Sequence, residues 1–415
     1  MVYFLSFHSR HSMTHVSAPV SALHGKRGSQ AHRLRRGLRA LCATLALTGA
    51  GSLAGAAQDC QINGQRVDPE RDATLAGKSG LMLCMNGGVR VREQQVNNGA
   101  FVGAVRLYEQ GQLAKSYSLN DKGNIDGPAR EFSPGGQVLR ESTYDNGVEV
   151  GLIRSYFPNG KLRRVAFRSE PGGERAVVEF TQTGQLMALR CGDAPMLAPI
   201  VDDARLCGFK GVLVQSELYD EQGTLRSRLV HSAGKRVRTE SLYDNGRIAT
   251  QEETSDKLII ERRFSSEGIK RYELISKLTA RAPVRQREQE FSEKGLLLRD
   301  QRWNDAGEPI SDISYTPTGQ VLSRTAYSGT GAVRMVDVIE FHPNGQRAAQ
   351  GHFLAPVRAS LVPIGTHLRF NDQGVLINEL TYNATGRITH ERAWNDAGEL
   401  VRNETVQPDG TRVSN

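Results

Sequence analysis

The chain alternates short stretches of mixed apolar and polar residues with turn-forming residues at a regular spacing. The stretches have strand-like composition, as in GQVLSRTAY (319–327) and GRITHERAW (386–394), and turns such as NDAG and TPTG separate them. These turns have the composition of a type I turn closed by a left-handed glycine. One strand and one turn every twelve residues give a hairpin about every 24 residues. The pattern therefore predicts an antiparallel β-meander.

Glycine marks the period. One series, spaced by twelve, is Gly295, Gly307, Gly319 and Gly331, and a second is Gly374, Gly386, Gly398 and Gly410. An aromatic residue stands four positions before most of these glycines. A helix would lose about 1 kcal/mol at each such glycine relative to alanine, so the period excludes a helical repeat.

The hexapeptide WNDAGE occurs twice, at 303–308 and at 394–399. We interpret it as a strand end, a turn and a strand start. The alternative is a pair of catalytic or calcium sites. Calcium-binding β-rolls repeat every nine residues with Asp at fixed positions, whereas the turn acid here wanders between Asp305 and Asp372 and is missing from TPTG. The structural interpretation is therefore favoured.

Neither face of the expected strands is apolar. In GRITHERAW strict alternation puts one set of side chains on one face (Ile388, His390, Arg392, Trp394) and the rest on the other (Thr389, Glu391, Ala393). A two-layer sandwich needs an apolar inner face. The sequence therefore predicts an all-β fold, an elongated single-layer antiparallel meander wet on both sides. Ladder hydrogen bonds and cross-strand pairs would hold it together.

The first 57 residues read as a signal peptide with an N-terminal extension. A basic run, RLRRGLR, precedes an apolar small-residue stretch that ends near residue 57, where a signal peptidase could cleave. We therefore expect a periplasmic or secreted protein without a transmembrane segment. The leader carries seven Lys/Arg and no acid, which leaves 46 basic and 45 acidic residues for the rest. This near-neutral balance disfavours nucleic acid as a partner.

Four cysteines remain after the leader: Cys60, Cys84, Cys191 and Cys207. Of the three pairings that four cysteines allow, the local one, Cys60–Cys84 and Cys191–Cys207, is favoured because each pair brackets a compositionally distinct segment. No CxxC and no nearby histidine supports a metal site instead. The expected organisation is a disulfide-closed cap at 58–98, repeats at 99–190, a disulfide-closed insertion at 191–212 and repeats at 213–415.

No catalytic, cofactor or metal motif stands out. HExxH, GxSxG and GxGxxG are all missing. The five histidines after the leader are expected to be exposed strand or turn residues (His231, His342, His352, His367, His390). We therefore expect no enzyme activity, no catalytic residues, no cofactor and no bound metal.

Units such as YDNGVEVGLIRSYFPNGKLRRVAF (144–167) and EFSPGGQVLRESTYDNG (131–147) resemble the bacterial MORN-repeat variant, whose proteins are widely labelled YwqK-like antitoxins. The resemblance covers roughly residues 100–190 and 213–413. It implies a single-layer hairpin array without catalytic residues that serves as an interaction surface. YNATGRITHERAWNDAGELVRNETVQPDG (382–410) also resembles the YD repeats of toxin shells, although those arrays are far longer.

Binding is therefore the expected function. The aromatic residues could line up as a ladder that stacks on sugar rings or binds an extended peptide, although the favoured interpretation is that the ladder only holds the sheet together. The candidate ladder consists of Phe291, Trp303, Tyr315, Tyr327, Phe370, Tyr382 and Trp394. We expect a protein-interaction scaffold with an unknown protein partner, and a toxin in an antitoxin or immunity pair is one candidate. A module that binds cell-wall glycan and a YD-repeat-like shell fragment are the alternatives.

Overall fold

The computed structural model describes residues 58–169, 173–329, 334–355 and 360–415. Over these ranges the chain forms strand after strand, with two four-residue helices, α1 (Asp72–Leu75) and α2 (Asp203–Leu206). Every strand pairing in these ranges is antiparallel, which confirms the all-β meander. The expected leader and its cleavage site lie outside the described residues. No helix in the described part of the chain could span a membrane.

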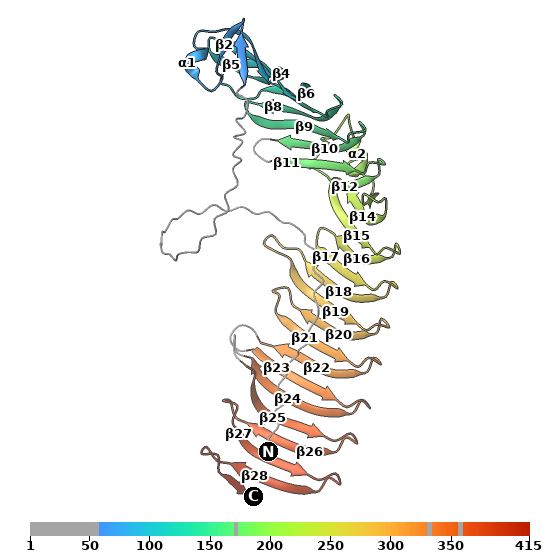
Figure 1. Cartoon of the computed structure of the whole chain (residues 1–415). Coiled ribbons are helices and arrows are strands. Elements are labelled where there is room, and N and C mark those ends of the chain that lie inside the picture. Colours follow the sequence, from blue (N-terminus) through green and yellow to red (C-terminus); the bar gives the residue numbers. More distant parts are fainter. Residues whose placement is uncertain (1–57, 170–172, 330–333, 356–359) are drawn as a thin grey trace, which may run out of the picture. The chain divides into compact units, whose positions relative to one another are not determined.

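The strands belong to two sheets and not to one (Figure 1). The first sheet has 12 strands: β1 (Asp59–Ile62), β2 (Gln65–Val67), β3 (Gly80–Asn86), β4 (Val89–Asn97), β5 (Ala100–Glu109), β6 (Gln112–Leu119), β7 (Gly127–Phe132), β8 (Val138–Asp145), β9 (Val148–Tyr156), β10 (Leu162–Ser169), β11 (Gly173–Phe180) and β12 (Leu186–Arg190). Its strand order departs from the sequence only at the start, where β1 lies between β2 and β3.

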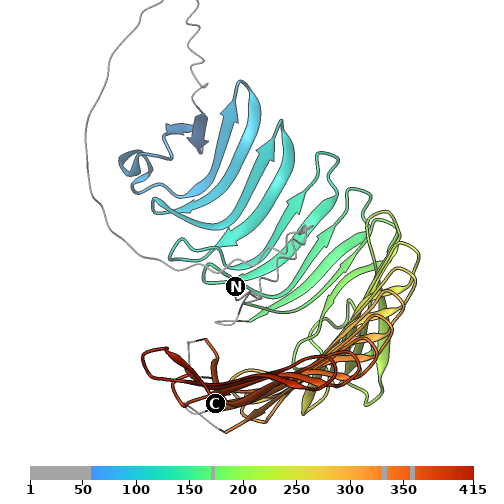
Figure 2. The same cartoon turned by 90° about the horizontal axis from the view of Figure 1, so that it is seen from below.

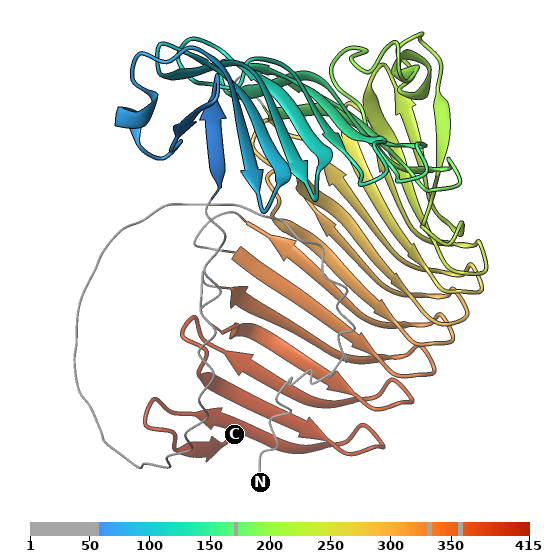
Figure 3. The same cartoon turned by 45° about the horizontal axis from the view of Figure 1, so that its top comes forward.

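The second sheet has 17 strands in strict sequence order, visible from two further sides in Figures 2 and 3. They are β13 (Val214–Tyr219), β14 (Leu225–Ser232), β15 (Lys235–Leu242), β16 (Ile248–Thr254), β17 (Leu258–Phe264), β18 (Lys270–Lys277), β19 (Val284–Phe291), β20 (Leu297–Trp303), β21 (Pro309–Tyr315), β22 (Val321–Ser328), β23 (Arg334–Phe341), β24 (Arg347–Ala355), β25 (Val362–Phe370), β26 (Leu376–Tyr382), β27 (Ile388–Trp394), β28 (Leu400–Val406) and β29 (Arg412–Ser414).

The break between the sheets falls at the segment between β12 and β13. It contains α2 and the disulfide Cys191–Cys207. The segment packs on the β14–β15 turn, where Gly234 donates its N–H to the carbonyl of Cys207 and Ala233 donates to Gly208. Because this segment makes these contacts, it does not add another strand beside β12. A sequence insertion has therefore divided the expected single sheet into two.

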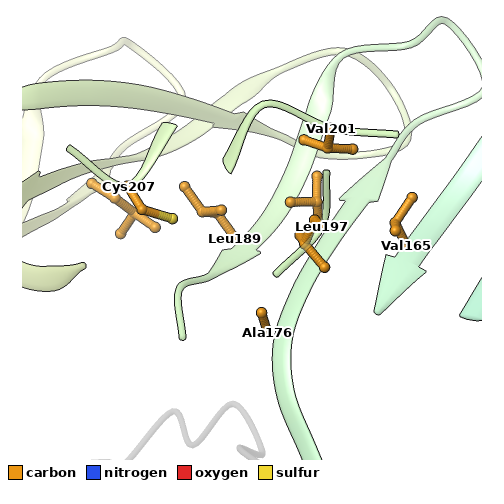
Figure 4. Close-up of a cluster of buried hydrophobic side chains, with 8 residues drawn as sticks. Val165, Ala176, Leu189, Leu197, Val201 and Cys207 are labelled. Carbon is orange, nitrogen blue, oxygen red and sulfur yellow. The ribbon is translucent and has the colours of Figure 1, made fainter. Parts of the chain in front are cut away.

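Each disulfide lies in an apolar cluster. Cys60 pairs with Cys84 beside Ile62, Met82 and Val96. Cys207 belongs to the second cluster, which joins residues of both sheets to the segment between them (Figure 4; Val165, Ala176, Val178, Leu189, Leu197, Val201, Leu229). The expectation of a sheet wet on both sides is therefore wrong at these two places. Here a covering segment, closed by a disulfide, lets one face of the sheet become dry.

Beyond Leu242 the described part of the second sheet has almost no dry core. Beyond Leu242, Val336 is the single buried apolar side chain among the residues that the structure describes. Polar and charged side chains are buried in the same region instead (Ser276, Gln289, Asp300, Glu391). Cross-strand pairing of polar side chains, and not apolar burial, therefore stabilises this part of the sheet.

A β-bulge interrupts the alternation of side chains next to the turns. Tyr382 pairs with Ile388, while Thr381 pairs with His390, so one residue of β27 is left over. The same shift recurs at Trp303, Tyr315, Phe341, Phe370 and Trp394. Because of the extra residue, Ile388 lies opposite Tyr382 and not in the row of His390. The strict two-face assignment for this strand was therefore wrong at its first residue.

Candidate binding surfaces

The repeated WNDAGE segments form the same turn. In the first copy Asn304 donates its N–H to the carbonyl of Glu308 at 2.9 Å, and Gly307 donates to the carbonyl of Asn304 at 2.9 Å. The Asn304 carboxamide oxygen accepts from the N–H groups of Ala306 (3.0 Å) and Glu308 (2.9 Å). Asn395 makes the same set of bonds in the second copy. The asparagine, and not the neighbouring acid, builds the turn.

Other turns obtain the same support from one of two positions. Some begin with a short acceptor side chain, as at Asn383, whose oxygen accepts from the N–H of Arg387 at 3.0 Å. Turns that begin with a long or aromatic residue use Asn or Asp two positions later instead. Asn344, in the turn that His342 begins, accepts from Gln346 at 3.0 Å. The turn residues therefore have a structural role that accounts for their recurrence.

A row of polar side chains crosses one face of the second sheet, and we call it the ionic row. Its members are directly opposite one another on β13 to β20: Glu217, Arg228, Glu240, Gln251, Arg262, Glu273, Gln289 and Asp300. Arg262 illustrates the contacts, because it donates to Glu273 at 2.7 Å and to Glu253 at 2.8 Å. Opposite charges, or a charge and an amide, face each other where a sandwich would place apolar residues.

The ion pairs shift the pKa values of their carboxyl groups. Burial by itself raises the pKa of Asp300, but hydrogen bonds and charge from Arg287 and Arg302 outweigh it and hold that pKa below its ordinary value. The same competition, between burial and contacts with Arg262 and Lys270, lowers the pKa of Glu273. Both carboxylates are therefore ionised at neutral pH.

The structure places the candidate ladder residues in two rows, one at each of the two sides of the sheet where strands end, and not in one line. Each is the last residue of its strand, except Tyr327, which is the last but one, and consecutive strands run in opposite directions. One row of strand ends contains Phe291, Tyr315, Phe370 and Trp394, and the opposite row contains Trp303, Tyr327 and Tyr382. Members on alternate strands lie about 10 Å apart, twice the strand spacing, which is too far to stack. The expected single ladder is therefore not formed.

Basic side chains cover several of these rings instead. Lys270 Nζ lies 4.5 Å from the ring centre of Phe291, and the Arg285 guanidinium lies 5.0 Å from that of Trp303. Arg347 and Arg392 lie at 6.0 Å and 5.8 Å from Phe370 and Trp394. These cation–π contacts stabilise each hairpin by about 0.5–1 kcal/mol and occupy a ring face that a ligand would need.

Three rings do contact one another, in edge-to-face or tilted geometry, and we call them the aromatic cluster: Phe353, His367 and Tyr382. The His367 ring centre lies 4.8 Å from that of Phe353 and 4.7 Å from that of Tyr382. Gly351 makes room, since a Cβ there would lie 2.8 Å from His367 Nδ1. Burial lowers the pKa of His367 and raises that of Tyr382. Sequence reasoning missed this cluster because a bulge in β25 brings His367 over Gly351.

The histidines differ more than expected. His231 is buried, with 2% of its surface exposed, because the segment after α2 covers it. His342 begins a turn, where its Nε2 lies 3.0 Å from the carbonyl oxygen of Phe370. His352 contacts Asp337 at 2.6 Å. Within the described ranges no three His, Cys, Asp or Glu side chains gather as metal ligands would.

A hollow of about 240 Å³ lies on one face of the first sheet, and we call it the β6–β7 hollow. Strands β6 and β7 pair only at Lys115–Glu131 and Ser116–Arg130. The next pair along β6 is Leu119 with Ile125, and the residues between these pairs are separated by a gap. Side chains of β5 to β8 surround the gap (Leu107, Tyr117, Ala129, Glu131, Ser142, Tyr144). A second hollow, over β16 and β17, is lined by polar and charged residues that include Glu252 and Glu261.

Comparison with known proteins bears on the region of the β6–β7 hollow. Residues 125–146 and 149–167 each match the MORN repeat variant. The chain is a β-repeat protein that contains MORN repeats. Each match covers a hairpin, the first formed by β7 and β8 and the second by β9 and β10. The hairpin is therefore the repeating unit, as the twelve-residue period predicted.

No curated protein matches the MORN-repeat chain. Among solved structures, a crystal structure of TcdB2-TccC3-Cdc42 matches 86% of this chain and 19% of that chain, at 11% identity and a TM-score of 0.17. A structure of the Photorhabdus luminescens Tc holotoxin pore matches 83% and 23%, at 13% identity and a TM-score of 0.12. This chain spans about a fifth of their length, and at these TM-scores the similarity carries no argument.

Proposed function

We propose that this MORN-repeat protein is an exported, non-enzymatic scaffold whose open sheet faces bind a protein partner. The observation that carries the proposal is the lack of a dry core beyond Leu242 in the described residues, apart from Val336. A sheet that buries neither face in a core leaves both available for recognition. The two disulfides fit export, because such bonds persist in oxidising compartments.

Fixed side chains make these faces suitable for recognition. Arg299 donates to Asp312 from Nε at 3.0 Å and from Nη2 at 2.5 Å, so both charges are held in place before a partner arrives. Preorganised side chains lose less conformational entropy on binding than mobile ones. Complementary charges on a partner would set its register along the sheet. The antitoxin role is the more specific form of the proposal, with a toxin as partner, and rests on the sequence resemblance.

Cross-linking in the native host tests this proposal, with the captured proteins identified by mass spectrometry. Arg324 and Thr325 are consecutive residues of β22, in a regularly paired part of the strand. Because side chains alternate along a strand, they face opposite sides of the sheet. Arg324→Glu and Thr325→Glu therefore form a matched pair of variants. One dominant partner that only one of the two variants loses would support the scaffold and identify its binding face. A toxin as that partner would support the antitoxin role, and capture unchanged by either would contradict the proposed faces.

A further inference from the structure

The charged side chains that line the β6–β7 hollow are paired with opposite charges. Lys115 contacts Glu131 at 2.8 Å, and Arg140 contacts Glu149 at 2.5 Å. The hydrogen bond to Glu131 raises the pKa of Lys115, so the ammonium stays charged and paired. An anionic ligand would have to break these pairs. The hollow therefore favours an uncharged ligand that can both donate and accept hydrogen bonds.

Two tyrosines give the hollow aromatic walls with free hydroxyl groups. The hydroxyls of Tyr156, Tyr219, Tyr243 and Tyr272 bond to acceptors. Those of Tyr117 and Tyr144, like those of Tyr315, Tyr327 and Tyr382, bond to no described residue, but only Tyr117 and Tyr144 line this hollow. Both of these rings are half-buried. Filling the hollow with a purely apolar group would leave the hydroxyls and the nearby charges unsatisfied, which costs free energy.

The size of the hollow limits the ligand to about one ring. Its volume of about 240 Å³ lies below the roughly 300–1,000 Å³ of sites that enclose drug-sized ligands. A pyranose ring combines C–H faces, which pack on aromatic rings, with hydroxyl groups that donate and accept at its edge. We propose that the β6–β7 hollow binds one uncharged pyranose ring of a glycan, with Tyr117 and Tyr144 against its faces and the Lys115–Glu131 pair at its hydroxyls.

Saturation-transfer NMR with the full chain tests this, using glucose and N-acetylglucosamine as probes. We expect both sugars to bind in the millimolar range. Tyr117→Ala and Tyr144→Ala should each weaken binding about tenfold, and Tyr315→Ala, in the other sheet, should leave it unchanged. Ala129→Leu narrows the hollow without removing a contact group and should abolish binding. Circular dichroism confirms that each variant is folded.

Two further probes separate the alternatives. Glucuronate has the same ring with a carboxylate and should bind more weakly than glucose, because Lys115 and Arg140 are already paired. N-acetylphenylalaninamide imitates a partner's side chain. The proposal is overturned if neither sugar binds, if the Tyr117, Tyr144 and Ala129 variants bind like the wild type, if glucuronate binds more tightly, or if only the phenylalanine probe binds. Protein capture on the second sheet is independent of all these results.

Discussion

Arg287 on β19 donates two parallel hydrogen bonds to Asp300 on β20, from Nε to Oδ1 at 2.9 Å and from Nη2 to Oδ2 at 2.8 Å. Asp300 has only 4% of its surface exposed. A carboxylate this buried is stable only while its partners remain charged and in place. Paired polar side chains therefore do in this sheet what apolar side chains do in a sandwich.

Replacing Asp300 with Asn should lower the free energy of unfolding by about 1–2 kcal/mol, since Arg287 and Arg302 lose a buried partner but remain partly solvated. Urea denaturation measures this. Glu221→Gln, in an exposed turn, is the control and should change little. The lowered pKa of Asp300 means that its contribution is present above the unfolded pKa of about 3.9 and is lost as the pH falls further. The difference between wild type and Asp300→Asn should therefore shrink in acid.

Asn304→Ala and Asn395→Ala should each cost about 1 kcal/mol, because the carboxamide satisfies two backbone N–H groups of the turn. Asp305→Ala and Asp396→Ala, one residue later in each turn, should cost less, since their contacts are exposed. Thermal denaturation compares the four variants. A larger loss at the aspartates, or a melting temperature raised by calcium, would favour the ion site that we rejected from the sequence.

Gly351→Ala should destabilise the sheet by about 1–3 kcal/mol, because the new methyl group would push His367 out from between Phe353 and Tyr382. Gly135→Ala is the matched control. Its added Cβ meets nothing closer than 3.7 Å, so its effect should be small. Denaturation curves give both values, and the tyrosine fluorescence of the Gly351 variant should change as Tyr382 becomes more exposed. Equal stability of the two variants would show that His367 moves aside without loss.

Acid should weaken the aromatic cluster. Burial lowers the pKa of His367 in the folded protein, so the unfolded chain binds a proton first, at about pH 6.5. The stability that neutral His367 contributes is thus complete above that pH and is lost as the pH falls through the lowered folded pKa. His367→Phe should reduce this loss between pH 7 and 5, measured by urea denaturation. His390→Phe is the control, and an identical pH profile for wild type and His367→Phe would contradict the assignment.

Local chemistry carries most of the fold. The spacing from Gly295 to Gly307 predicts both the strand length and the hairpin turn, because a left-handed glycine and a capping Asn such as Asn304 act within a few residues of each other. The disulfide pairs also follow from local composition. These features need no knowledge of distant contacts, so the sequence by itself determined an antiparallel meander of about 24-residue hairpins.

Tertiary structure decided what lies beside what. Strand direction reverses at each turn. Phe291 and Trp303 occupy equivalent positions in the sequence repeat but therefore lie at opposite rows of strand ends. Interruptions in strand pairing bring His367 against Gly351 and let Tyr117 line a hollow beside Tyr144. The segment closed by Cys191–Cys207 occupies one sheet end and divides the array in two. Each outcome depends on pairing register between strands, which the composition of a single repeat does not specify.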